Sequence, residues 1–213
     1  MERLNDSFTT LAEESYVEFE EKRSLFIGRA LRTDDEQAAQ DFIKKIKKLH
    51  ADATHNVFAY TMNKGVLARY SDDGEPQGTS GMPTLDAIRK SGVDNACVVI
   101  TRYFGGTLLG TGGLVRAYTQ ALQEALKHCP TAMMKYGKRI QVDTDYNGIG
   151  KILYFMGQQG LSQESSEYTD KVRIIVLVPG EEVEHFCKEV TELTAGRSKL
   201  EVLEEVFYPV PEK

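Results

Sequence analysis

Five glycines and two arginines between residues 102 and 116 form the stretch whose residue types best suit binding chemistry. An apolar strand is expected to end in Arg102-Tyr103-Phe104, and an amphipathic helix is expected to follow the glycines. Glycine permits positive φ values, a helix N-terminus adds unpaired N–H groups, and guanidinium groups pair with phosphate. The residues predicted to bind an anion or RNA are Arg102, Gly105, Gly106, Gly110, Gly112, Gly113 and Arg116.

The same glycines have a structural interpretation, because they also allow a strand to reverse tightly against the helix that follows. Two familiar nucleotide motifs are excluded. A Walker A loop needs Gly-Lys-Ser/Thr, whereas Gly113 is followed by Leu114. The dinucleotide fingerprint needs a third glycine where this chain has Val115. Neither a nucleotide triphosphatase nor a Rossmann dehydrogenase is predicted.

A second candidate region is the aperiodic stretch from residue 71 to 83, with His55 at the start of an earlier strand. Asp72, Asp73 and Glu75 offer oxygen ligands, but their spacing matches no calcium loop or magnesium site, so no metal is predicted. The favoured alternative is a loop whose carboxylates bind water or their own backbone. For His55 the alternative to catalysis is a local hydrogen bond. Catalytic residues stay unassigned, and no cofactor is predicted.

Composition limits the class of protein. The net charge of −6 over 213 residues excludes a protein that coats nucleic acid with its whole surface, but it allows a local basic patch. The densest basic cluster is Lys44 to Lys48, which is also typical of a solvated helix end. Ile174 to Val178 is the longest aliphatic run, so no membrane span is predicted. Because Met1 to Asp6 has no export pattern, a cytoplasmic location is expected.

The hydrophobic periodicity predicts two domains, residues 1–132 and 135–213, joined by a linker at residues 129–137. In the first domain, strands are expected at residues 16–21, 24–31, 57–62, 66–70 and 96–104, and helices after a Thr33–Glu36 capping box, at 84–90 and from 114. The second domain is predicted as strand 138–144, helix 147–158, strands 162–169 and 171–178, helix 181–193 and strand 200–208. That order is βαββαβ, the ferredoxin-like unit.

Two segments carry a family resemblance: Asp72-Asp73-Gly74-Glu75-Pro76, and the run from Arg102-Tyr103-Phe104-Gly105-Gly106 to Gly112-Gly113-Leu114. With them the sequence resembles the IMPACT family, in its bacterial YigZ and YvyE type. The resemblance implies an α+β protein. Its N-terminal domain would be similar to the ribosomal protein S5 domain 2-like fold, and its C-terminal domain would be ferredoxin-like. Eukaryotic relatives act in translational control.

The function expected from these features is a translation-associated binding protein that contacts the ribosome or RNA and takes part in regulation of translation. The glycine loop, the two arginines and the lysine cluster would meet RNA phosphate. One alternative is an enzyme on a small phosphorylated substrate, because the implied N-terminal fold is similar to one used by small-molecule kinases. Another is a protein-interaction module without catalysis. The candidate partners are thus the ribosome, RNA or a protein partner in translation, and no membrane partner is expected.

Overall fold

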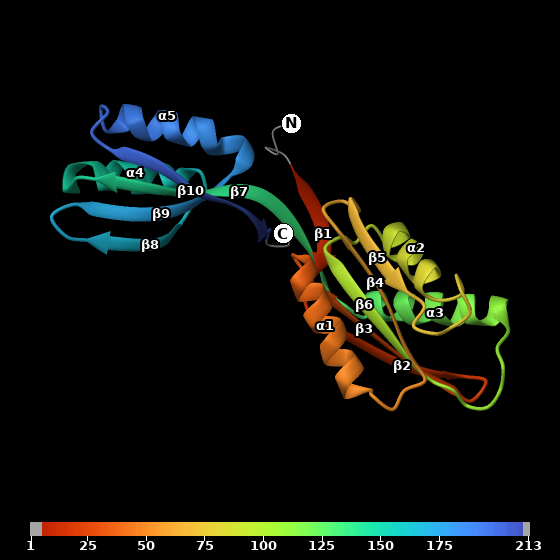
Figure 1. Cartoon of the computed structure of the whole chain (residues 1–213). Helices are drawn as coiled ribbons and strands as arrows, with labels where there is room; N and C mark the ends of the chain where they lie inside the picture. Colours follow the sequence, from red (N-terminus) through yellow and green to blue (C-terminus); the bar gives the residue numbers. More distant parts are fainter. Residues whose placement is uncertain (1–5, 211–213) are drawn as a thin grey trace. The chain divides into compact units, whose positions relative to one another are not determined.

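A computed structural model describes residues 6–210 of the chain and shows an α+β protein, as predicted (Figure 1). The chain divides into two compact units. One unit is Phe8–Met133, and the other comprises residues 134–210 together with residues 6–7. No helix within the described residues is long and apolar enough to cross a membrane. The expectation drawn from the first six residues concerns positions that, apart from Asp6, lie outside the described part of the chain.

The N-terminal unit is built on an antiparallel sheet in which β6 is the central strand. The order is β2 (Ser15–Glu21), β3 (Ser24–Arg32), β6 (Ala96–Tyr103), β4 (His55–Met62) and β5 (Leu67–Ser71). The register places Phe26 of β3 and His55 of β4 opposite Arg102 of β6. Segments far apart in the sequence are therefore brought together at one end of the central strand.

Helices cover both faces of this sheet, which explains why β6 is apolar at almost every position. The helix α1 (Glu36–Leu49) packs on one face with Cys97 and Val99. The helices α2 (Gly81–Ser91) and α3 (Thr111–Lys127) pack on the other face, with Val98 and Ile100. Figure 1 shows α1 on one side and α2 and α3 on the other.

Several element boundaries differ from the sequence predictions; β4 and α3, for example, begin at His55 and Thr111 rather than at residues 57 and 114. The cap of α1 is Asp35, whose carboxylate accepts the Ala38 N–H at 2.7 Å, whereas the Thr33 N–H donates to Asn95 and fixes Thr33 outside the helix. The helix α2 begins at Gly81 rather than residue 84. A strand before residue 16, β1 (Ser7–Leu11), was not predicted.

The predicted linker is mostly regular structure, because β7 runs from Thr131 to Thr144 as one strand. The Tyr136 N–H donates to the Asp6 carbonyl oxygen at 2.9 Å, so backbone pairing begins well before residue 138. The division between the two compact units falls between Met133 and Met134, within the predicted residues 129–137, and most of that segment is strand.

The C-terminal unit has the predicted βαββαβ order. After β7 come α4 (Tyr146–Gln158), β8 (Gln163–Tyr168), β9 (Val172–Pro179), the 3-10 turn η1 (Gly180–Glu182), α5 (Val183–Leu193) and β10 (Lys199–Pro209). The strands pair antiparallel in the order β10-β7-β9-β8. Ile140, Val176 and Phe186 belong to a single buried cluster, so this unit has a core of its own.

Candidate functional site

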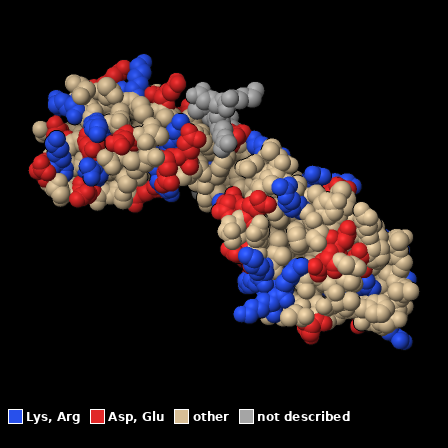
Figure 2. Space-filling view, viewed as in Figure 1, with Lys and Arg blue, Asp and Glu red and all other residues tan. Residues whose placement is uncertain are grey.

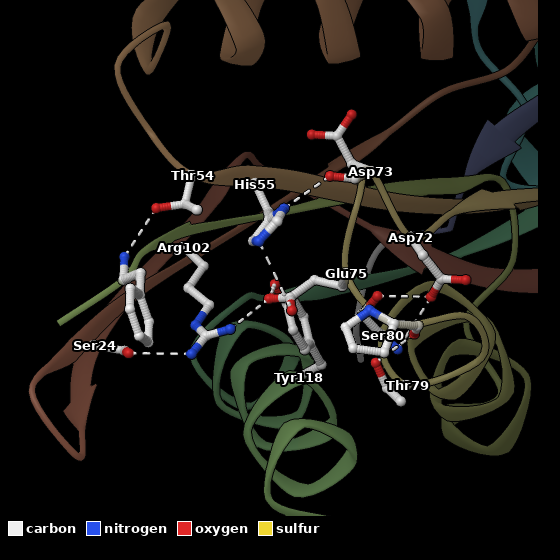
Figure 3. Close-up of polar contacts among 12 residues, drawn as sticks. Ser24, Thr54, His55, Asp72, Asp73, Glu75, Thr79, Ser80, Arg102 and Tyr118 are labelled. Atoms are coloured by element: carbon white, nitrogen blue, oxygen red, sulfur yellow. Dashed lines mark hydrogen bonds and ion pairs between the residues drawn. The ribbon is translucent and has the colours of Figure 1, made fainter. Parts of the chain in front are cut away.

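Arg102 is a buried residue and not an exposed phosphate ligand. Only 4 % of its surface is exposed. Its Nη1 donates to Glu75 Oε1 at 2.7 Å and its Nη2 to Ser24 Oγ at 3.3 Å (Figure 3). The prediction that Arg102 closes on an anion from solvent is therefore wrong, because its charge is already paired inside the domain.

The Glu75 carboxylate joins the two regions that the sequence presented as separate candidates. Its Oε1 also accepts the Tyr118 hydroxyl at 2.8 Å, and its Oε2 lies 3.8 Å from His55 Nε2. Burial and the neighbouring Glu75 carboxylate raise the pKa of Tyr118, so its hydroxyl stays a hydrogen-bond donor. Figure 3 shows these side chains converging from β4, β6, α3 and the loop of residues 72–80 between β5 and α2, which we call the acidic loop. This buried network connects the two candidate regions.

His55 is fixed by the acidic loop. Its Nδ1 lies 2.8 Å from the Asp73 carbonyl oxygen, which can only accept, so we assign the proton of the neutral ring to Nδ1. The Asp73 carboxylate is occupied as well: it accepts the Asn56 N–H and pairs with Lys47, both at 2.6 Å. The local hydrogen-bonding role considered for His55 is the one that the structure displays.

Asp72 organises the acidic loop through its own backbone. Its carboxylate accepts the N–H groups of Gly78, Ser80 and Gly81 and the Ser80 hydroxyl. Burial acts to raise the pKa of Asp72, but these hydrogen bonds outweigh it and hold the pKa below its ordinary value. Within residues 6–210, no three His, Cys, Asp or Glu side chains are placed to hold a metal ion.

Gly105 has a structural role at the start of the glycine loop. A Cβ at this position would lie 1.8 Å from the Arg23 carbonyl oxygen, so only glycine allows the loop to contact the turn between β2 and β3. Gly106 and Gly110 have φ values of 81° and 73°, and Gly110 precedes the first residue of α3. The tight-reversal interpretation thus applies to the first part of the loop.

Arg116 lies where the sequence predicted it, at the exposed start of α3. A Cβ at Gly112 would be 3.7 Å from Arg116 Nη1, so the guanidinium lies over the first helical turn. No side chain caps this end of α3, and no carboxylate among the described residues pairs with Arg116. Gly113 packs against Leu109 instead. An anion at this N-terminus would meet backbone N–H groups and one guanidinium.

Three residues at the same end of the domain were missed by the sequence analysis: Lys22, Arg23 and Phe104. The first two are exposed and form the β2–β3 turn, with φ values of 47° and 67°. Figure 1 shows this turn beside the connection from β6 to α3. Phe104 is 44 % exposed. The sequence indicated this turn only weakly, because Lys-Arg is not a usual two-residue hairpin sequence. It also did not reveal that β3 pairs with β6, which brings the turn close to Phe104.

We call this region the basic loop end: Lys22, Arg23, Phe104, the loop residues 105–113 and Arg116. It differs from the lysine cluster on α1, over which Figure 2 shows basic side chains gathered. There Lys44, Lys45 and Lys47 pair with Asp41, Glu14 and Asp73 respectively. The cluster therefore has the character of a solvated helix face with local ion pairs, and the basic loop end is the better candidate for a binding site.

Comparison with known proteins places the chain in a family. Residues 22–126 match the Impact N-terminal domain, and residues 142–197 match a domain of unknown function, DUF1949. The chain is 37 % identical to IMPACT family member YvyE of Bacillus subtilis (strain 168), over 91 % of this chain and 90 % of that protein. It is 33 % identical to IMPACT family member YigZ of Escherichia coli (strain K12), over 86 % and 92 %.

A solved structure described as a crystal structure of an hypothetical protein is also similar, with a TM-score of 0.67 and 32 % identity over 93 % of this chain and 98 % of that one. The two family matches fall one in each of the two compact units, and the similar structure covers both. The chain belongs to the IMPACT family, as its two motif segments predicted.

Proposed function

We propose that this protein binds RNA, as a translation-associated factor that contacts the ribosome, through the basic loop end. The observation that carries the proposal is the position of Arg23 and Arg116 at the two ends of one glycine loop. Gly105 contacts the backbone of Arg23, and Gly112 lies under the Arg116 guanidinium. Two cations and a helix N-terminus are thereby presented to one stretch of phosphate backbone.

Binding at this end is expected to be electrostatic and weak. Glu20 and Glu21 precede the turn, so the local excess of positive charge is small. Three cations, Lys22, Arg23 and Arg116, are available for phosphate contacts. Each contact releases a counterion, so the logarithm of the affinity for single-stranded RNA should fall with the logarithm of salt concentration with a slope of about −2.

The buried network argues against the enzyme alternative. Glu75 is occupied by Arg102 and Tyr118, Asp73 by Lys47 and Asn56, and Asp72 by its own loop. A general base or nucleophile has to reach a substrate proton or carbon, and these carboxylates are already satisfied by the fold. The acidic loop is therefore better explained as the support of the binding end than as a reaction centre.

The test is co-sedimentation of the full chain with ribosomes at low salt, repeated with single alanine variants. Arg116→Ala and Arg23→Ala should lower binding and make the salt slope shallower, with the melting temperature unchanged. Arg89→Ala is the matched control, because it removes an equal charge from α2, where Arg89 pairs with Asp86. Absence of the wild-type protein from the ribosomal pellet at low salt would refute the proposal. Equal loss in all three variants would place binding elsewhere.

A further inference from the structure

We infer that Phe104 is a stacking surface for an unpaired base, so that the RNA bound at the basic loop end is single-stranded. This inference rests on the proposed function and names its substrate class. An aromatic ring can hold a base only if it is exposed and fixed in place. Phe104 fulfils both conditions.

The ring of Phe104 is backed by a buried cation. The Arg102 Cζ lies over it, 5.4 Å from the ring centroid, and also lies over Phe26, 5.5 Å from that centroid. Because Glu75 and Ser24 hold the guanidinium, the ring rests on a group that cannot move aside. Phe104 nevertheless remains 44 % exposed to solvent.

The backbone on both sides of the ring is also held. The Phe104 N–H donates to Thr54 Oγ1 at 3.0 Å, and the Thr54 N–H donates to the Arg102 carbonyl oxygen at 3.0 Å. The next residue, Gly105, donates to Ser24 Oγ at 3.3 Å. Because the backbone of this segment is already held in the free protein, binding a base should cost little free energy for ordering the segment.

The surroundings select nucleic acid over other partners for this ring. Gly105, the residue after Phe104, contacts the backbone of Arg23, an exposed basic residue of the β2–β3 turn. Alternation of an aromatic face with basic groups matches the alternation of base and phosphate along a strand. In a duplex the bases are stacked on each other and cannot reach a protein ring, whereas unpaired bases in loops and ends can.

The domain offers a matched control at Tyr16. This ring is 48 % exposed and has the Arg29 Cζ over it at 4.7 Å, so it shares the cation-backed geometry. Its hydroxyl, however, donates to Glu18, and Arg29 pairs with Glu14. A phosphate backbone would be repelled there, so Tyr16 should not contribute to RNA binding.

The experiment measures fluorescence anisotropy of a labelled single-stranded oligouridylate and of a duplex of equal length, at low salt. Phe104→Leu should weaken single-strand binding about tenfold, within the range for stacking one base, and Phe104→Tyr should restore it. The wild type should bind the duplex more weakly than the single strand, and Phe104→Leu should leave duplex binding unchanged. Tyr16→Leu should change neither.

Each contrary result has its own meaning. If the wild type binds strand and duplex equally and Phe104→Leu has no effect, stacking is refuted while RNA binding stands. If the wild type binds neither RNA and is also absent from the ribosomal pellet, both the inference and the proposed function fail. If Phe104→Leu abolishes ribosome binding while the wild type has no affinity for either RNA, the ring docks a protein, and the inference is overturned.

Discussion

Two aromatic–arginine–glutamate sets on the N-terminal domain contain the same kinds of group and differ in depth. In the set of Phe104, Arg102 and Glu75, the two ion-paired side chains are 5 % and 3 % exposed. In the set of Tyr16, Arg29 and Glu14, they are 21 % and 28 % exposed. Arg102 lies on the central strand β6, whereas Arg29 lies on β3 and its aromatic partner Tyr16 on the neighbouring edge strand β2. The depth of each ion pair, rather than the kinds of group in it, is expected to decide how much it stabilises the fold.

The largest difference is expected when each carboxylate is neutralised. Glu75→Gln leaves Arg102 buried without a counter-charge, and breaking a buried pair in this way costs about 3–5 kcal/mol. Glu14→Gln removes a partly exposed partner, worth no more than about 1 kcal/mol. Urea unfolding of the two variants beside the wild type measures both. Equal losses would show that the depth of the pair has no energetic meaning.

A smaller effect is expected from removing one hydroxyl from each set. Tyr118→Phe takes away a hydrogen bond to the buried Glu75 carboxylate, which should cost about 1.5–3 kcal/mol. Tyr16→Phe removes the exposed bond to Glu18 and should change the free energy of unfolding by no more than about 0.5 kcal/mol. The melting temperatures of the two variants give the comparison. A loss in Tyr16→Phe as large as in Tyr118→Phe would contradict it.

The smallest effect concerns pH and salt. The folded-state pKa values of Asp72 and Glu14 are both held below their ordinary values, so each carboxylate stabilises the fold above its unfolded pKa, near pH 4. That contribution is lost as the pH falls through the folded value. For Glu14 burial opposes the shift and Lys45 and Arg29 produce it, so high salt should weaken it.

Asp72 is held by hydrogen bonds within its loop, so its pH dependence should persist in high salt. Unfolding free energies measured at acid and neutral pH, with and without high salt, separate the two. Asp72→Asn should flatten the salt-resistant part of the profile and Glu14→Gln the salt-sensitive part. A salt-resistant part that is unchanged in Asp72→Asn would assign it to another carboxylate.

Much of the fold could be predicted from the sequence because local patterns specify it. The period-two strands, the amphipathic face of α3 and the βαββαβ order are all visible in short windows. The division between the two units falls within the predicted residues 129–137, but the sequence did not show that β7 begins directly after Pro130, with Met134 and Tyr136 buried. A proline such as Pro130 indicates where one element ends, but it does not indicate whether the next element begins immediately.

The site was predicted in part. Gly112 and Arg116 lie together because they are one helical turn apart, which the sequence shows directly. The pairing of Arg102 with Glu75 joins residues 27 positions apart and depends on the sheet order, which no local pattern reveals. One signal was present: an arginine near the end of a mostly apolar strand is expected to need a buried carboxylate, and the acidic loop was the nearest source.

Because β6 is the central strand, the backbone at the basic loop end should open easily in the loop and hardly at all in the strand before it. Seven of its eight residues are buried, and β3 and β4 flank it on both sides. Its amide hydrogens should exchange with solvent only when the whole domain unfolds, whereas those of the exposed residues from Gly106 to Leu108 should exchange through local opening. A ligand that orders the loop should therefore slow amide exchange only in the residues after Gly105. The amides of β6, before Gly105, already exchange only through unfolding of the whole domain, so the ligand cannot slow them through local ordering.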